Sequence, residues 1–131
     1  MPAGPTSRRR PDMVRLLAVF LFFWEPLHFA AEALGVLPTI AYRGPLAVLE
    51  LSVHGAIAAL AAAAGFALFN GAPAARPLAI LAVVAVAART IQSVYWSVLP
   101  NNTAPGAEPV YLTAAVVFVI VAMAAIRRVP R

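Results

Sequence analysis

The sequence predicts an all-α integral membrane protein, a four-helix up-down-up-down bundle with both termini in the cytoplasm. Three observations lead to this fold class. Hydrophobic residues make up 63% of the 131 residues and only 11% are charged, whereas a soluble domain is nearer half apolar with about a quarter of its residues charged. Four apolar segments are long enough to cross a bilayer, which takes roughly 20 residues. The arginines gather at the ends of these segments.

Each predicted span ends at a turn-like segment that is rich in proline, glycine or asparagine. The spans are residues 14–37, 45–69, 77–99 and 110–126, and the breaks are residues 38–44, 70–73 and 100–106. Proline and glycine punctuate helices at such breaks, and short connections make consecutive helices antiparallel. Residues 13–131 are therefore expected to form a single transmembrane domain. Residues 1–12 are rich in Pro, Gly and Arg, and we expect a disordered cytoplasmic tail there.

The placement of the arginines predicts the orientation. If the N-terminus is inside, the outer side holds only Arg43 and the cytoplasmic side holds eight arginines, which is the positive-inside pattern of a protein of the inner (plasma) membrane. Those eight are Arg8, Arg9, Arg10, Arg15, Arg76, Arg127, Arg128 and Arg131. Because these cations flank apolar segments and form no basic face, the net charge of +5 does not indicate nucleic acid.

The N-terminus also allows a signal-peptide interpretation, because Ser7-Arg8-Arg9 precedes an apolar run. The run continues to Leu37 and contains only a weak cleavage site, so a retained first span is favoured. The chain has no cysteine, which excludes disulfides, thiolate metal sites and CxxC redox chemistry.

Ionisable side chains fall inside the first three spans, where a charge near the bilayer centre costs roughly 2.5–3.5 kcal/mol. They are Glu25, His28, Glu32, Glu50, His54 and Arg89. Helical periodicity puts the polar residues of each span on one face. These faces are Glu25, His28 and Glu32; Glu50 and His54; and Arg89, Gln92, Ser93 and Trp96. Turning all three faces inward predicts a polar pocket in the outer half of the bundle, closed near the midplane by a Glu25–Arg89 ion pair.

Paired carboxylates and imidazoles in such a pocket suit proton transfer. The predicted catalytic residues are Glu25, His28, Glu50, His54 and Arg89, and the predicted substrate-binding residues are Glu32, Gln92, Ser93 and Trp96. Each has a structural alternative: the ion pair can be purely stabilising, the histidines can simply join helices, and Trp96 can be an interface anchor. Pro26 is expected to kink the first span, because its ring removes a backbone hydrogen bond.

The sequence assigns no metal and no other cofactor. A single metal on His28, His54 and a glutamate is geometrically possible. The Glu25-x-x-His28 spacing also occurs in di-iron bundles, but those sites use four carboxylates and these spans supply only three.

Residues 44–87 resemble the DoxX-like group of small four-helix bacterial membrane proteins. The shared features are Leu49-Glu50 at the start of the second span, Gly55 and Gly65 within it, a short inner turn, and an Ala/Leu-rich third span after Arg76. An arginine, Arg15, also enters the first helix, whereas the segment from Trp24 to His28 departs from the pattern. The resemblance implies a four-helix bundle with a quinone-linked or redox-accessory role.

Three functions fit this pattern. The first is a membrane enzyme or redox-accessory protein that transfers protons on a lipophilic small molecule such as a quinone or isoprenoid. The second is an assembly or scaffold subunit of a membrane complex, and the third is a small proton- or cation-coupled transporter, which would need a dimer. The expected partners are accordingly membrane lipids, a lipophilic small molecule, and a second copy or another membrane subunit.

Overall fold

The computed structural model describes residues 12–100 and 103–130, and every regular element in those ranges is a helix. Four helices are long and apolar enough to cross a membrane: Met13–Arg43, Pro45–Asn70, Ala75–Tyr95 and Glu108–Ile126. The all-helical, four-span prediction is confirmed to that extent. The predicted tail up to residue 11, and Arg131, lie outside the described residues.

The first long helix is built from several pieces. They are α1 (Asp12–Val19), the π-helical turn η1 (Phe20–Trp24), α2 (Glu25–Val36), the 3-10 turn η2 (Leu37–Thr39) and α3 (Ile40–Arg43). The π turn comes directly before Glu25 and Pro26, where the proline lacks an N–H and its ring presses on the carbonyl of the preceding turn. A wider turn relieves that clash, and such turns often occur at functional sites. A kink was predicted at Pro26, and the structure has a local widening of the helix directly before it.

The first connection differs from the prediction. Residues 38–44 were expected to form a loop, but helical structure continues to Arg43 and the chain reverses at Gly44 alone. Gly44 has a φ of 85°, a conformation that glycine adopts without a steric penalty. Pro45 then begins α4 (Pro45–Asn70), because proline suits the first turn of a helix.

The other boundaries follow from local chemistry. Helix α4 ends where Gly71 adopts a left-handed conformation with a φ of 65°. Helix α5 (Ala75–Tyr95) ends four residues before the predicted limit of 99, and α6 (Glu108–Ile126) follows. The early end of α5 has a polar cause, because Ser97 and Val98 leave the helix to hydrogen-bond Glu50.

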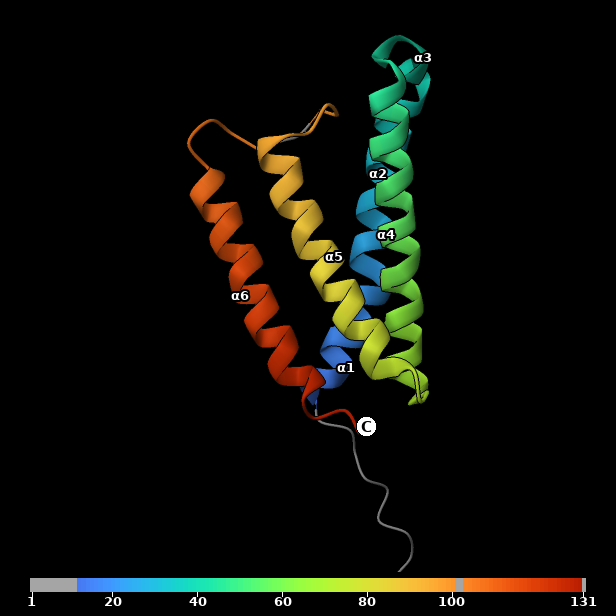
Figure 1. Ribbon diagram of the computed structural model, residues 1–131, viewed down its shortest axis with the longest axis vertical. Helices are drawn as coiled ribbons and strands as arrows, with labels where there is room; N and C mark the ends of the chain where they lie inside the picture. Colours follow the sequence, from blue (N-terminus) through green and yellow to red (C-terminus); the bar gives the residue numbers. More distant parts are fainter. Residues whose placement is uncertain (1–11, 101–102, 131) are drawn as a thin grey trace, which may run out of the picture.

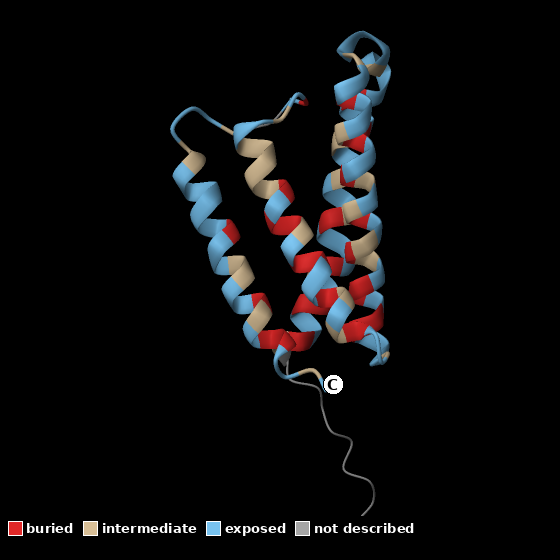
Figure 2. Ribbon diagram, in the orientation of Figure 1, coloured by how far each residue is buried: buried red, intermediate tan, exposed pale blue. Residues whose placement is uncertain are grey.

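The main hydrophobic core lies at the end of the bundle where α1 begins and α6 ends, which we call the terminal end (Figures 1 and 2). The facing surfaces of α4 and α5 are small there, and Ala61, Ala64, Ala79 and Ala82 have no exposed surface. Small residues let membrane helices approach closely. Toward the opposite end, which we call the hairpin end because Gly44 lies there, α5 and α6 diverge from the pair formed by α2 and α4 (Figure 1).

Candidate functional site

Polar side chains from α2, α4 and α5 meet between the main core and the hairpin end. We call this set the polar cluster; it consists of Glu25, Glu32, Glu50, His54, Arg89, Gln92 and Ser97. Glu25, His54 and Arg89 are 4%, 0% and 7% exposed, and direct contacts join all members. The prediction that ionisable side chains of the first three spans converge is confirmed for Glu25, Glu32, Glu50, His54 and Arg89, whereas His28 is exposed.

His54 lies between two carboxylates of α2. Its Nε2 is 3.1 Å from Oε1 of Glu25, and its Nδ1 is hydrogen-bonded to Oε2 of Glu32. This bridge is possible because residues seven apart lie on the same face of a helix, so α2 presents both acids to α4. The imidazole is further enclosed by Phe29 and His28, whose rings meet it edge-on at centroid distances of 5.4 and 5.5 Å.

Arg89 binds the two carboxylates nearer the hairpin end. Its Nη2 lies 3.0 and 3.3 Å from the two oxygens of Glu32, and its Nη1 lies 3.2 Å from Oε1 of Glu50. Nη1 also donates to the side-chain oxygen of Gln92. The predicted Glu25–Arg89 pair is therefore wrong, because His54 occupies the position beside Glu25 and Arg89 pairs with the shallower acids.

Glu50 fixes the end of α5. Its carboxylate accepts hydrogen bonds from Nε2 of Gln92 at 3.0 Å, from the hydroxyl of Ser97 and from the backbone N–H of Val98 at 2.8 Å. Ser97 and Val98 were not predicted, because they follow the last helical turn and no helical period places them. The only available signal was that Ser97 lies four residues after Ser93, on the polar face of the third span.

Two predicted substrate-binding residues, Trp96 and Ser93, lie outside the polar cluster, which contains the other two, Gln92 and Glu32. The Trp96 side chain is 71% exposed, and its ring lies against Tyr95 at a centroid distance of 5.7 Å, which fits the alternative role of an interface anchor. The hydroxyl of Ser93 donates to the carbonyl of Thr90 in its own helix at 2.8 Å. Contact of Trp96 and Ser93 with a substrate stays a prediction.

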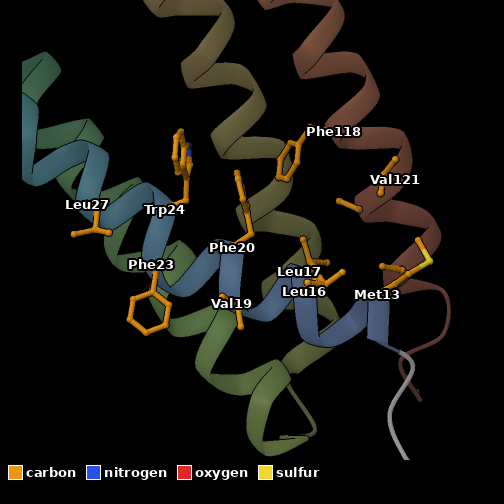
Figure 3. A pocket seen from close by; sticks show the side chains of 12 residues that line it. Met13, Leu16, Leu17, Val19, Phe20, Phe23, Trp24, Leu27, Phe118 and Val121 are labelled. Carbon is orange, nitrogen blue, oxygen red and sulfur yellow. The ribbon is translucent and has the colours of Figure 1, made fainter.

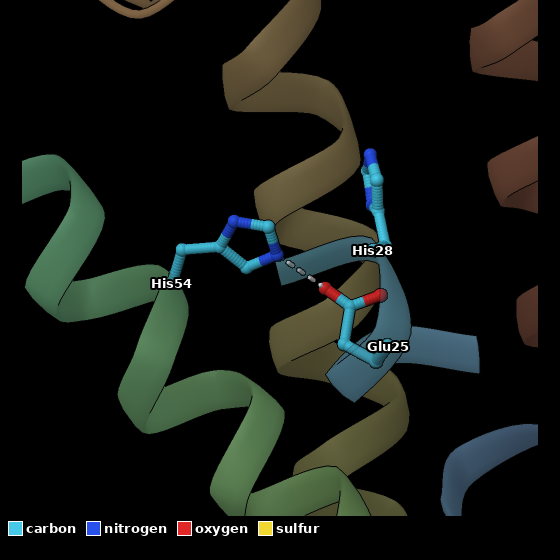
Figure 4. A group of neighbouring side chains, drawn as sticks. All are labelled: Glu25, His28 and His54. Atoms are coloured by element: carbon cyan, nitrogen blue, oxygen red, sulfur yellow. Dashed lines mark hydrogen bonds and ion pairs between the residues drawn. The ribbon is translucent and has the colours of Figure 1, made fainter. Parts of the chain in front are cut away.

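Glu25, His28 and His54 form a group that could hold a metal ion. One possible ligand atom from each residue lies within 4.8 Å of the others. Glu25 points one carboxylate oxygen at His54, and the exposed His28 ring stands on the other side of that carboxylate (Figure 4).

An apolar groove of about 540 Å³ runs beside this group, between the first long helix and α6 (Figure 3). Its walls include Leu16, Phe20, Trp24 and Leu27 on one side, and Phe118 and Val121 on the other. Trp24 and Leu27 directly precede Glu25 and His28 in the chain. The side chains of Glu25, His28 and His54 are not among those that line the groove, so the groove and this group are neighbours along the same helix.

Comparisons of the chain with protein-family models, with curated proteins and with solved structures find no match. The DoxX-like resemblance, and the redox-accessory role that it implies, stay predictions.

Proposed function

We propose that this is an inner-membrane protein that binds a lipophilic small molecule, a quinone or an isoprenoid, in the apolar groove and transfers a proton to or from its polar end. In this proposal the bundle runs up-down-up-down with both termini in the cytoplasm. The hairpin end, with Gly44, then faces the outside. The observation that carries the proposal is that Trp24 and Leu27, which line the groove, are followed in the same helix by the buried Glu25 and the exposed His28.

The groove offers the surface that such a molecule needs. Its walls are aliphatic and aromatic side chains, and binding sites for small molecules are typically apolar with few convergent polar groups. Residues 16 to 27 of the first long helix line it, a rise of roughly 16 Å at 1.5 Å per residue. That length accommodates two or three isoprene units, with the polar end beside His28.

The polar cluster extends from Glu25 toward the hairpin end. Glu25 contacts His54, and His54 contacts Glu32, which gives a chain of groups that can each carry a proton. Arg89 does not release its proton in proteins, so it ends this chain and holds Glu32 and Glu50 in place. The side chain of Glu32 is 14% exposed, whereas that of His54 is fully buried, so in this proposal Glu32 is the outer end of the proton chain.

Fluorescence tests the binding step. The chain has only two tryptophans, and Trp24 lines the groove, so a Trp96→Phe variant leaves one reporter at the site. A quinone should quench this emission saturably, and an isoprenoid alcohol should reverse the quenching by competition. Val121→Phe, which fills the groove, should weaken binding at least tenfold. Val116→Phe is the matched control, because Val116 is equally exposed on α6 but does not line the groove.

Infrared difference spectroscopy tests the proton transfer. Reducing a bound quinone electrochemically should change a carboxylic-acid band that shifts in D₂O and is missing in Glu25→Gln. The binding site would be excluded if quenching rose linearly with quinone concentration and were equal in Val121→Phe and Val116→Phe. That result would favour the scaffold function for this groove. Saturable binding with no carboxyl signal would retain binding but exclude the proton role of Glu25.

A further inference from the structure

We propose that Glu25, His28 and His54 bind one divalent metal ion of the zinc type, and that Glu32 is the carboxylate that orients His54 toward it. The metal would occupy the proton-carrying atoms of Glu25 and His54, so the proton chain of the proposed function belongs to the metal-free protein. The metal site does not depend on the groove or on any lipophilic molecule, because it follows from the geometry of the polar cluster and His28.

The first reason is the position of His54 between two carboxylates. A neutral imidazole carries one N–H and one lone pair, yet both ring nitrogens of His54 face carboxylate oxygens. If Nδ1–H donates to Glu32, the Nε2 lone pair faces the Oε1 of Glu25 at 3.1 Å, which is repulsive. A positive charge between the two atoms removes this conflict: a proton supplies one unit of charge, and a metal ion bound to both atoms supplies two.

His28 supplies a third ligand. The three possible ligand atoms lie within 4.8 Å of one another, whereas a tetrahedral zinc site with bonds of about 2.0–2.1 Å places its ligand atoms about 3.3 Å apart. The widest pair therefore has to close by about 1.5 Å. Rotation of the His28 side chain can provide this movement, because His28 is exposed while Glu25 and His54 are fixed by packing.

The surrounding side chains match the support that a metal-binding histidine requires. Such a histidine almost always donates its other N–H to a carboxylate or a carbonyl, which fixes the tautomer and the ring orientation. Glu32 takes this position at Nδ1 of His54. Arg89 in turn holds both oxygens of Glu32, so the orienting carboxylate is itself oriented.

The net charge of the polar cluster also favours a bound divalent cation. The cluster holds three carboxylates, Glu25, Glu32 and Glu50, and a single guanidinium, Arg89. With neutral histidines the cluster carries a formal charge of minus two in a low-dielectric region, where uncompensated charge is costly. One divalent cation brings the sum to zero, whereas an imidazolium at His54 leaves one negative charge.

The donor set selects the kind of metal and the kind of site. Two imidazoles and one carboxylate suit Zn²⁺ and its neighbours, and the chain has no thiolate for softer ions. Three protein ligands leave a fourth position open for water or a ligand oxygen, as in catalytic zinc sites.

The test measures metal binding directly. The full chain, purified without a histidine tag, is stripped with a chelator, equilibrated with buffered Zn²⁺ and analysed by mass spectrometry for bound metal. One equivalent is expected, and Co²⁺ should give the intense visible bands of a tetrahedral site. His28→Ala should retain the helical circular dichroism, because the residue is exposed, but lose binding more than 100-fold. Glu32→Gln should weaken binding about 10- to 100-fold.

Glu108→Gln is the matched control, because this acid lies at the start of α6, away from the polar cluster. Its zinc content should equal that of the unaltered protein. The metal site would be overturned if the unaltered protein bound less than a tenth of an equivalent of zinc. Equal zinc binding in His28→Ala and Glu108→Gln would also overturn it. Quinone quenching of Trp24 in the chelated protein decides the proposed function separately, so either proposal can fail alone.

Discussion

Replacing Gly65 with alanine adds one methyl group where α4 passes closest to the first long helix. A Cβ at this position would lie 2.6 Å from the carbonyl oxygen of Ala18 and 2.7 Å from the backbone nitrogen of Phe22. Both neighbours are main-chain atoms, so no side chain can rotate away. Ordinary contact begins at 3.4 Å, and the two helices therefore have to separate by about 0.8 Å.

The cost of this separation can be isolated with a second glycine. Overpacking of a well-packed core typically costs about 1–3 kcal/mol, while alanine gains up to about 1 kcal/mol over glycine in helix propensity. Gly35 is also helical, and a Cβ there would meet no atom within 4 Å. Gly35→Ala therefore gains the propensity alone, and Gly65→Ala should be less stable than Gly35→Ala by about 1–3 kcal/mol.

The strain at Gly65 also reaches the candidate site. Phe22 belongs to the π turn that precedes Glu25, so moving it away from α4 lengthens the 3.1 Å contact between Glu25 and His54. Stability is measured as the free energy of unfolding in mixed micelles, and site geometry as Zn²⁺ affinity in the same samples. Equal stability of the Gly65→Ala and Gly35→Ala variants would refute the close backbone approach, and with it this account of how Glu25 is positioned.

Three further variants test other parts of the structure. Arg89→Leu should destabilise the fold by about 3–5 kcal/mol, because it leaves buried carboxylates without a cation. Adding Glu32→Gln to this variant should recover part of the lost stability in the same unfolding assay. No recovery would mean that Glu32 and Arg89 are not coupled. Glu50→Gln should speed hydrogen exchange at the Val98 amide, which donates to Glu50, while amides in the middle of α5 stay protected. Because the chain has no cysteine, Tyr42→Cys and Arg128→Cys each introduce a single labelling site. A membrane-impermeant maleimide added to intact cells should label Tyr42→Cys and not Arg128→Cys. The reverse pattern would invert the proposed orientation.

The sequence was sufficient to predict that most of the ionisable side chains of the first three spans converge, but not how they pair. Helical periodicity placed Glu25 and Glu32 on one face and Arg89 on another, and mutual burial of polar faces follows from the cost of exposing them to lipid. Pairing depends on which helices are direct neighbours. Helix α4 packs against both α2 and α5, so His54 reaches Glu25 first and Arg89 is left with Glu32 and Glu50.

Helix ends were less predictable for a related reason. The predicted limit of the third span at residue 99 came from hydropathy, but α5 stops at Tyr95 because Glu50 of another helix accepts hydrogen bonds from the residues that follow. Conversely, Pro38 was taken as a loop signal, yet it occupies the first turn of a 3-10 segment, where its missing N–H costs nothing. The first difference arises from hydrogen bonds that hydropathy does not report, and the second from the position of the proline in its turn.

The same contacts that make the polar cluster chemically interesting also hold the diverging half of the bundle together. At the terminal end, α4 and α5 are joined by alanines in close contact. Toward the hairpin end, the ion pair of Arg89 with Glu32 and the hydrogen bonds of Glu50 connect α5 to α2 and α4. Loss of activity in variants of these residues would therefore not separate chemistry from folding. His28 does separate them, because it is exposed and meets the His54 ring edge-on without joining the ion pairs of the cluster, so a defect confined to His28→Ala reports on function.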